Sequence, residues 1–246
     1  TVSPVDGFNI KGPYKYIATP GAGEVQSTIG DMARYARALL NLGNGIVTPD
    51  IFSKMISFQY GYDPRMLHMG IAFQKRTRFD NNIFMHGGGV AGGWNTLLEV
   101  FPEKNFALVI HLNLQDSISI EVFSKITQAV LGLSNQPDTY NPVNSHTMSH
   151  SVGTYVLPDG TNVNFRPENT HGKIVIKKRE SGLMLISERG KWRDGIRLLS
   201  KDPKDGDLLA LDTGEIDLPT IILRRGLDGR VTGLQIDSLV LMNKVD

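Results

Sequence analysis

The residues with the clearest chemical potential lie together in one short segment, Met85-His86-Gly-Gly-Gly-Val-Ala-Gly-Gly-Trp94. His86 is titratable, and the glycines that follow it leave the backbone without side chains. A bound group can approach such a backbone closely, and amide N–H groups are free to point at it. The segment therefore predicts a binding or catalytic site beyond a strand end. A glycine-rich turn with a surface histidine is the alternative interpretation.

Trp94 and Asn95 follow the glycines and are candidates for contacts with a substrate. Trp94 suits the entrance of a site because it comes directly after the glycines, and a core position is the alternative. Asn95 and Thr96 carry side chains that can donate hydrogen bonds to a substrate. We therefore expect substrate-binding residues at Trp94 and Asn95.

The other histidines give weaker signals. His146 and His150 have the i, i+4 spacing of metal ligands on a helix, but they lie in a polar segment with no nearby acidic residue. Solvated histidines are the favoured interpretation there. His111 lies inside an apolar run, which favours a hydrogen-bonded core residue. The sequence therefore predicts no metal site, and without a glycine-rich phosphate motif it predicts no cofactor.

The composition excludes several classes of protein. The 246-residue chain has no cysteine, which excludes disulfides, thiolate nucleophiles and cysteine-held metal centres. Its 26 Lys and Arg residues balance 25 Asp and Glu residues, and the formal charge of +1 argues against a nucleic-acid partner. No apolar run approaches the roughly 20 residues of a membrane span. We therefore expect no membrane-spanning segment.

Residues 1–132 are predicted to form a sheet with helices packed against it. Ser27-Thr28 is a helix cap before an apolar stripe at helical spacing, which Gly43 and Gly45 end. Thr48-Pro49 starts a second helix, with proline at its first position. Residues 1–20 have loop character and supply no obvious first strand. Further strands are predicted at 69–73, 82–85, 96–101 and 106–112, and a last helix at 118–131.

The composition of the sequence changes after residue 132. Residues 133–150 are polar and twice interrupted by proline, the composition of a linker. Residues 151–246 contain eight or nine short apolar runs separated by turn residues. They predict a small antiparallel barrel, with a sandwich as the alternative. The runs lie at 152–156, 162–165, 173–177, 183–186, 196–199, 207–211, 220–224, 233–236 and 239–242.

Several segments of residues 18–131 follow one another in an order and spacing that a known protein family also has. They are Pro20-Gly-Ala-Gly23, Ser27-Thr28, Asp31-Met-Ala-Arg34 through Leu39-Leu40, Gly43, His86-Gly87-Gly88, Gly92, and Leu97 through Glu103 with the apolar strand ending at Asn113. Over about residues 18–131 this order resembles the serine β-lactamase-like family, in the branch of class C β-lactamases, D,D-peptidases and penicillin-binding-type esterases. The resemblance implies an α+β fold, here part of a β-lactamase/transpeptidase-like domain.

The resemblance also implies roles for individual residues. In that family a Ser-x-x-Lys helix supplies the nucleophile, a Tyr-x-Asn loop supplies a second acid/base group, and Lys-x-Gly or His-x-Gly lies on the strand beside the serine. His86 and Gly88 match the third motif, and the Gly89 N–H would be the strand's oxyanion donor. The catalytic residues implied for this chain are therefore His86, Gly88 and Gly89.

The sequence departs from the family in two motifs. No serine is followed three positions later by lysine, and no Tyr-x-Asn triplet exists. We therefore expect this chain to be the C-terminal portion of a longer protein, whose N-terminal part carries the nucleophile and is its main partner. Without a nucleophile, the chain alone should be catalytically inactive.

The C-terminal unit fits the same resemblance. Several relatives carry a small lipocalin-like barrel that begins with a Gly-x-Tyr strand, which Gly153-Thr-Tyr155 resembles. The resemblance implies that the chain is part of a serine hydrolase or acyltransferase, which forms an acyl-enzyme on a small amide, ester or peptide substrate. A homo-oligomer is a further expectation. The competing hypothesis is a non-catalytic module for ligand binding or oligomerisation, attached to a degenerate β-lactamase-like remnant.

Overall fold

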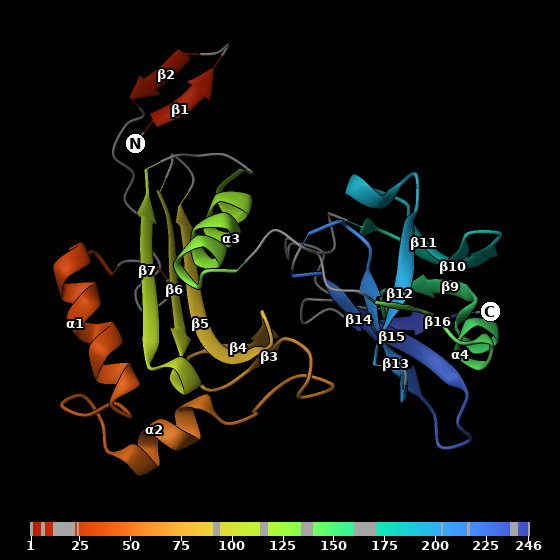
Figure 1. The fold of residues 1–246 in the computed structure, drawn as a ribbon, viewed down its shortest axis with the longest axis horizontal. Coiled ribbons are helices and arrows are strands. Elements are labelled where there is room, and N and C mark those ends of the chain that lie inside the picture. The colour runs from red at the N-terminus through yellow and green to blue at the C-terminus, as the bar shows by residue number, and fades with distance from the viewer. Residues whose placement is uncertain are drawn as a thin grey trace. The chain divides into compact units, whose positions relative to one another are not determined.

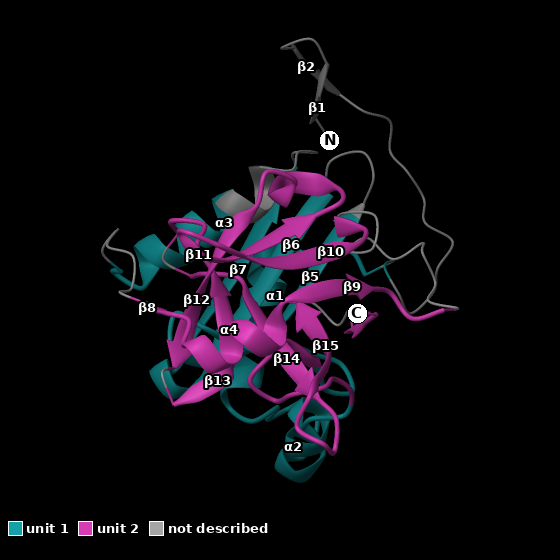
Figure 2. Ribbon diagram, turned by 90° about the vertical axis from the view of Figure 1, so that its right-hand side faces the viewer, with its two compact units in different colours: residues 1–59, 69–134 teal, residues 60–68, 135–246 magenta. Residues whose placement is uncertain are grey.

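The protein is described from a computed structural model, which covers residues 2–5, 8–11, 23, 25–90, 94–113, 118–133, 140–159, 171–202, 204–215, 217–236 and 241–245. The chain divides into two compact units (Figures 1 and 2). Unit 1 contains residues 1–59 and 69–134, and unit 2 contains residues 60–68 and 135–246. Within the described ranges, no helix is long and apolar enough to cross a membrane.

A five-stranded sheet in the order β3-β4-β5-β6-β7 forms the body of unit 1. β4 to β7 pair antiparallel in sequence order. The turn between the last two strands is a short 3-10 helix that ends at Asn105, which has a left-handed backbone with a φ of 48°. The strands are β3 (His68–Met69), β4 (Gln74–Arg78), β5 (Asn81–Val90), β6 (Trp94–Phe101) and β7 (Phe106–Leu112).

Two capped helices follow the N-terminal segment, as the sequence predicts. The Thr28 hydroxyl accepts a hydrogen bond from the Asp31 N–H at 3.1 Å and begins α1 (Ile29–Leu40). Thr48 caps α2 (Pro49–Ile56) in the same way, and Pro49 stands at the first turn, where its missing N–H costs no helical hydrogen bond. These local signals account for both helix starts.

The helices cover both faces of the sheet. α1 and α2 contribute Ala36, Leu39 and Phe52 to a core on one face. α3 (Ile118–Val130) reaches the other face, where its Thr127 bonds Glu99. The strand residues of the first core are Phe73, Phe84, Leu98 and Val100.

Two expectations for unit 1 are wrong. Residues 1–20 were expected to have loop character, but within their described part β1 (Val2–Val5) and β2 (Phe8–Lys11) pair antiparallel. The intervening Asp-Gly dipeptide is a strong hairpin signal that the sequence contained. Residues 69–73 were expected to be one strand, but pairing stops at Met69. The Gly70 N–H donates to the Phe73 carbonyl at 2.7 Å, which makes a turn instead of a ladder.

Unit 2 is a closed antiparallel barrel of eight described strands. The order runs β11-β10-β9-β16-β15-β14-β13-β12, and pairing between β11 and β12 closes it. Closure excludes the predicted alternative of a sandwich and removes exposed edges. The strands are β9 (Gly153–Val156), β10 (Ile174–Arg179), β11 (Gly182–Ser187), β12 (Ile196–Asp202), β13 (Asp205–Leu211), β14 (Thr220–Arg225), β15 (Val231–Ile236) and β16 (Leu241–Lys244).

The predicted strands of unit 2 agree with this barrel wherever the structure describes them. The run at 162–165 lies outside the described residues. The barrel core consists mainly of large aliphatic side chains, with Tyr155 and Trp192 among them. Tyr155 is fully buried, and its hydroxyl donates to the Ser151 carbonyl at 2.6 Å, so the one polar atom of this side chain is satisfied.

The range predicted as a linker, 133–150, is folded over its described second part. β8 (Asn141–Pro142) pairs with β12, and α4 (Ser145–Ser151) follows it. The Asn144 side chain caps α4 by accepting from the Thr147 N–H at 2.8 Å, while Val143 is buried in the barrel core. Residues 145–150 of this polar range therefore belong to a capped helix, which composition alone did not distinguish from a linker.

Candidate functional site

His86 lies within β5, not at the end of a strand as expected. β5 continues unbroken from Asn81 through the glycines to Val90, because each of its last residues pairs with β6. The strand that ends near His86 is its other neighbour: β4 pairs with β5 only as far as Met85. The feature that marks His86 is therefore the end of its partner strand.

This arrangement leaves one edge of β5 open beside the glycines. Among the described strands, none pairs with residues 86–90 on the side of β4. Alternate residues of a strand direct their N–H and C=O groups to the same edge. Some backbone groups of the segment from His86 to Val90 therefore face this open edge, where they can bond a ligand.

The antiparallel register assigns the predicted site residues to two faces. His86 pairs with Leu98, Gly88 with Thr96, and directly paired residues project to the same face. Because Leu98 belongs to the core under α1, His86 and Thr96 lie on that face. Trp94 also lies on it, and it is 46% exposed, consistent with an entrance position and not with the core alternative.

Asn95 lies on the opposite face. It pairs with Gly89, and successive residues of a strand alternate between faces. The structure therefore separates the side chains of Asn95 and His86, while Thr96, paired with Gly88, shares the face of His86. Gly89 has no side chain, so it can contribute to a site only through its backbone.

The imidazole of His86 is exposed and has no hydrogen-bond or ion-pair partner within the described residues. His111 was expected to be a hydrogen-bonded core residue, but it is exposed. Its register position explains the difference: His111 pairs with Thr96 near the end of β7, beyond the core residue Leu98. Two exposed histidines therefore lie on the sheet face that also carries Thr96.

A buried ion pair lies on the other face of the sheet and was not predicted. Glu99 is fully buried, bonds the guanidinium of Arg78 and accepts from the Thr127 hydroxyl at 2.7 Å. The contact joins β6, β4 and α3 behind the candidate site. A glutamate inside the apolar run Leu97-Leu98-Glu99-Val100 was the available sequence signal, since an unpaired buried carboxylate is costly.

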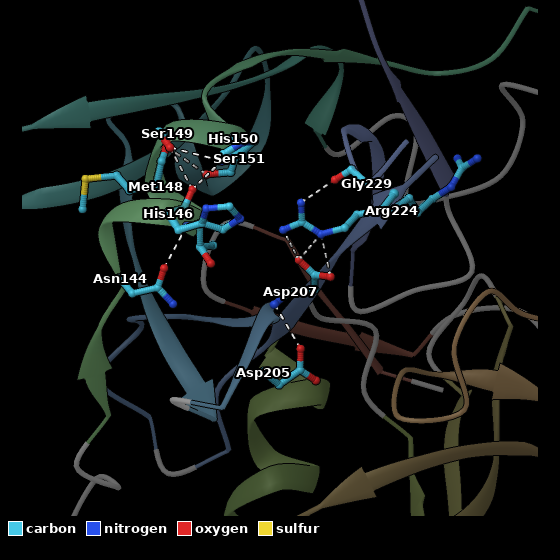
Figure 3. A network of polar contacts seen from close by, with 12 residues as sticks. Asn144, His146, Met148, Ser149, His150, Ser151, Asp205, Asp207, Arg224 and Gly229 are labelled. Atoms are coloured by element: carbon cyan, nitrogen blue, oxygen red, sulfur yellow. Dashed lines mark hydrogen bonds and ion pairs between the residues drawn. The ribbon is translucent and has the colours of Figure 1, made fainter. Parts of the chain in front are cut away.

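A polar hollow of about 900 Å³ lies in unit 2, between α4 and the β13–β14 strands. Two of its charges are paired, since Arg225 bonds Asp207 through two nitrogens and also donates to the Gly229 carbonyl. Figure 3 labels Asp207 and Gly229 in this network of polar contacts. Arg65 pairs with Asp205. None of the residues predicted for catalysis or substrate binding lines this hollow.

His146 and His150 lie on α4 beside this hollow, with ring centroids 4.2 Å apart. The described residues contain no group of three His, Cys, Asp or Glu side chains placed to hold a metal ion. The His150 ring has a local partner instead, since its Nδ1 lies 2.8 Å from the His146 carbonyl.

The sequence matches no described protein family and no curated protein. A weakly similar solved structure exists. It is the octameric penicillin-binding protein homologue from Pyrococcus abyssi, with a TM-score of 0.40 and 16% sequence identity. The match covers 88% of this chain and 47% of the other, so the chain spans about half the length of the structure it matches.

Proposed function

We propose that unit 1 is part of the catalytic domain of a serine hydrolase or acyltransferase, of the β-lactamase-like kind that the sequence resembles. The observation that carries the proposal is the open edge of β5 beside the glycines, with the exposed His86 on the adjoining face. An acyl-transfer site needs N–H donors at the place where the carbonyl oxygen becomes negative. A glycine strand with an unpaired edge supplies such donors.

In this proposal the Gly89 N–H donates to the acyl oxygen. Gly88 has no side chain, so the substrate can lie close to the backbone of β5. A serine hydroxyl from a part of the protein outside this chain attacks the carbonyl carbon. The new C–O bond pushes electrons onto the oxygen, and the amine or alcohol leaves with a proton as the tetrahedral species collapses. Water or another acceptor then releases the acyl group from the serine by the reverse chemistry.

His86 has two possible roles in this scheme. It can hold the group that transfers the proton, or it can bind a carboxylate of the substrate. Trp94 and Thr96 lie on the same face and would border the acyl group. Asn95, on the opposite face, would act only through the backbone of β6.

The barrel of unit 2 is proposed to be a lipocalin-like accessory module. The competing hypothesis, a barrel that carries a small apolar ligand, has less support because large buried aliphatic side chains occupy the described interior positions. We therefore assign no ligand to the barrel.

Labelling with a fluorophosphonate tests where the nucleophile is. The 246-residue chain should remain unlabelled and should not hydrolyse nitrophenyl acetate above background. A longer form of the protein should be labelled at the serine of a Ser-x-x-Lys motif. Labelling of any serine within the 246 residues would contradict the proposal.

A further inference from the structure

The hollow of about 900 Å³ in unit 2 contains polar groups that the fold itself does not use. It is lined by residues 144–147 around the start of α4, by residues 204–207 around the start of β13, and by Arg225 of β14. Figure 3 shows Asn144 and His146 opposite Asp205 and Asp207. All of these residues belong to unit 2, so the hollow is formed within one compact unit.

The two carboxylates of the hollow already have cationic partners. Asp207 accepts hydrogen bonds from Nε and Nη2 of Arg225 at 2.9 and 2.6 Å. Asp205 pairs with Arg65 and also accepts from the Asp207 N–H at 3.0 Å. Charge-assisted bonds of this kind occupy the carboxylate oxygens and offset their charge. Asp205 and Asp207 are therefore poor ligands for a cation.

The groups left over are hydrogen-bond donors. Within the described residues, the Thr147 hydroxyl, the Asn144 amide nitrogen and the Lys204 ammonium have no hydrogen-bond or ion-pair partner. Thr147 is only 1% exposed, so its hydroxyl is a buried polar group without a bond. Such a group costs about 1–3 kcal/mol, which a ligand atom that bonds it would recover.

Two of these donors converge on Gly206. A Cβ atom at this residue would overlap Thr147 Oγ1 and lie 3.6 Å from Asn144 Nδ2. Because glycine has no Cβ atom, the hydroxyl and the amide nitrogen share the space in front of its backbone. Lys204 lines the same hollow two positions earlier in the chain.

We propose that this hollow binds an oxyanion, the phosphate or carboxylate group of a small ligand, between Thr147, Asn144 and Lys204. An oxyanion only accepts hydrogen bonds, and these three side chains can all donate them. Lys204 supplies the positive charge that no carboxylate among the described residues pairs with. The site lies in unit 2 and does not rest on the function proposed for unit 1.

Titration of the 246-residue chain with inorganic phosphate, followed by amide NMR at constant pH and ionic strength, tests the site. Amides of residues 144–147 and 204–207 should shift and reach saturation. Lys204→Ala removes the charge and Thr147→Val removes the hydroxyl, so each should weaken phosphate binding about tenfold. Thr147→Val should not lower the melting temperature, since the hydroxyl makes no bond to the described residues.

A matched control and a further variant complete the experiment. Lys178→Ala removes an exposed lysine of β10 that does not line the hollow, and it should bind phosphate as the wild type does. Gly206→Ala fills the space between the two donors and should weaken binding at least tenfold, which keeps the test decisive if Thr147→Val does not fold.

Titration with acetate in place of phosphate distinguishes the two sources of the oxyanion. Tighter binding of acetate would indicate a carboxylate ligand, and tighter binding of phosphate would indicate a phosphorylated one. Shifts that do not saturate with either anion would overturn the proposal. Equal phosphate affinity of Lys204→Ala and Lys178→Ala would also overturn it, because Lys204 would then contribute no more than any surface lysine.

Discussion

The hydroxyl oxygen of Thr96 lies 2.7 Å from the position that a Cβ atom on Gly88 would occupy. Real Cβ contacts are not this short, so a side chain at residue 88 would require the Thr96 hydroxyl or the strand to shift. The candidate site is therefore shaped by one side chain on β6 lying over one glycine on β5.

The first prediction follows from that contact. Gly88→Ala should destabilise unit 1 by about 1–3 kcal/mol, because the added methyl group overpacks the site under Thr96. Thr96→Ala in the same chain should recover most of the loss, since it removes the opposing oxygen. Denaturant unfolding of the two single variants and the double variant measures this. Equal stability of Gly88→Ala and the wild type would mean that the two strands adjust freely.

A second prediction concerns the buried ion pair behind the site. Glu99→Gln removes the charge of the buried carboxylate that pairs with the mostly buried Arg78 guanidinium, and it should lower the free energy of unfolding by about 3–5 kcal/mol. Lys54→Ala is the matched control, because it breaks the exposed Lys54–Asp50 pair, where a loss of at most about 1 kcal/mol is expected. Similar losses in both variants would show that the Glu99 pair contributes no more than a surface contact.

A third prediction concerns pH. Burial, with a smaller contribution from Lys191, lowers the pKa of His171, whose ring stacks on Trp192 at 4.4 Å. The unfolded chain then binds a proton more readily than the folded chain, so stability should fall as the pH drops below about 6.5. His171→Phe keeps a flat ring and should flatten this dependence between pH 7 and 5. An unchanged slope in His171→Phe would assign the dependence to another group.

A hydrogen bond from Arg65 lowers the pKa of Asp63. This carboxyl therefore affects stability in a different pH range from His171. Because its folded pKa lies below its unfolded value, the stabilisation is present above about pH 4 and is lost at lower pH. The titrations of Asp63 and His171 therefore do not overlap in the range measured.

Local patterns predicted the elements whose causes are local. Thr28 and Thr48 begin α1 and α2 because a cap acts within one turn. The barrel strands follow from short apolar runs between turns, whereas ring closure depends on the pairing of β11 with β12, which no local pattern contains. β4 was missed because its sequence, Gln-Lys-Arg-Thr-Arg, carries no apolar pattern and depends on pairing with β5.

The sequence predicted which candidate residues are neighbours, and not the strand edge beside them. His86, Gly88, Gly89 and Trp94 are neighbours in the paired strands, as their sequence positions suggest. The open edge beside them depends on where β4 stops, a contact between strands that no local pattern contains. The burial of Met66 was not predicted either, since it depends on a barrel residue more than 150 positions away, Thr220.

A fourth prediction concerns His86 in a form of the protein that carries the nucleophile. His86→Ala should leave the fold intact, because the side chain is exposed. If the imidazole positions a proton-transfer group, kcat should fall about 10²–10⁴-fold. If it binds a substrate carboxylate, KM should rise with kcat nearly unchanged. Steady-state kinetics separates the two roles, and unchanged kcat and KM in a folded variant would exclude both.

The proposed oxyanion site depends most directly on the backbone N–H of Gly89. Gly89→Pro removes this donor, whereas Gly89→Ala keeps it and is the matched control. In a form of the protein that carries the nucleophile, the rate of acylation by nitrophenyl acetate should fall about 10²–10³-fold in Gly89→Pro and stay near wild type in Gly89→Ala. Circular dichroism should first show that both variants fold. Equal acylation rates in the two folded variants would contradict the assignment of the β5 edge as the oxyanion site.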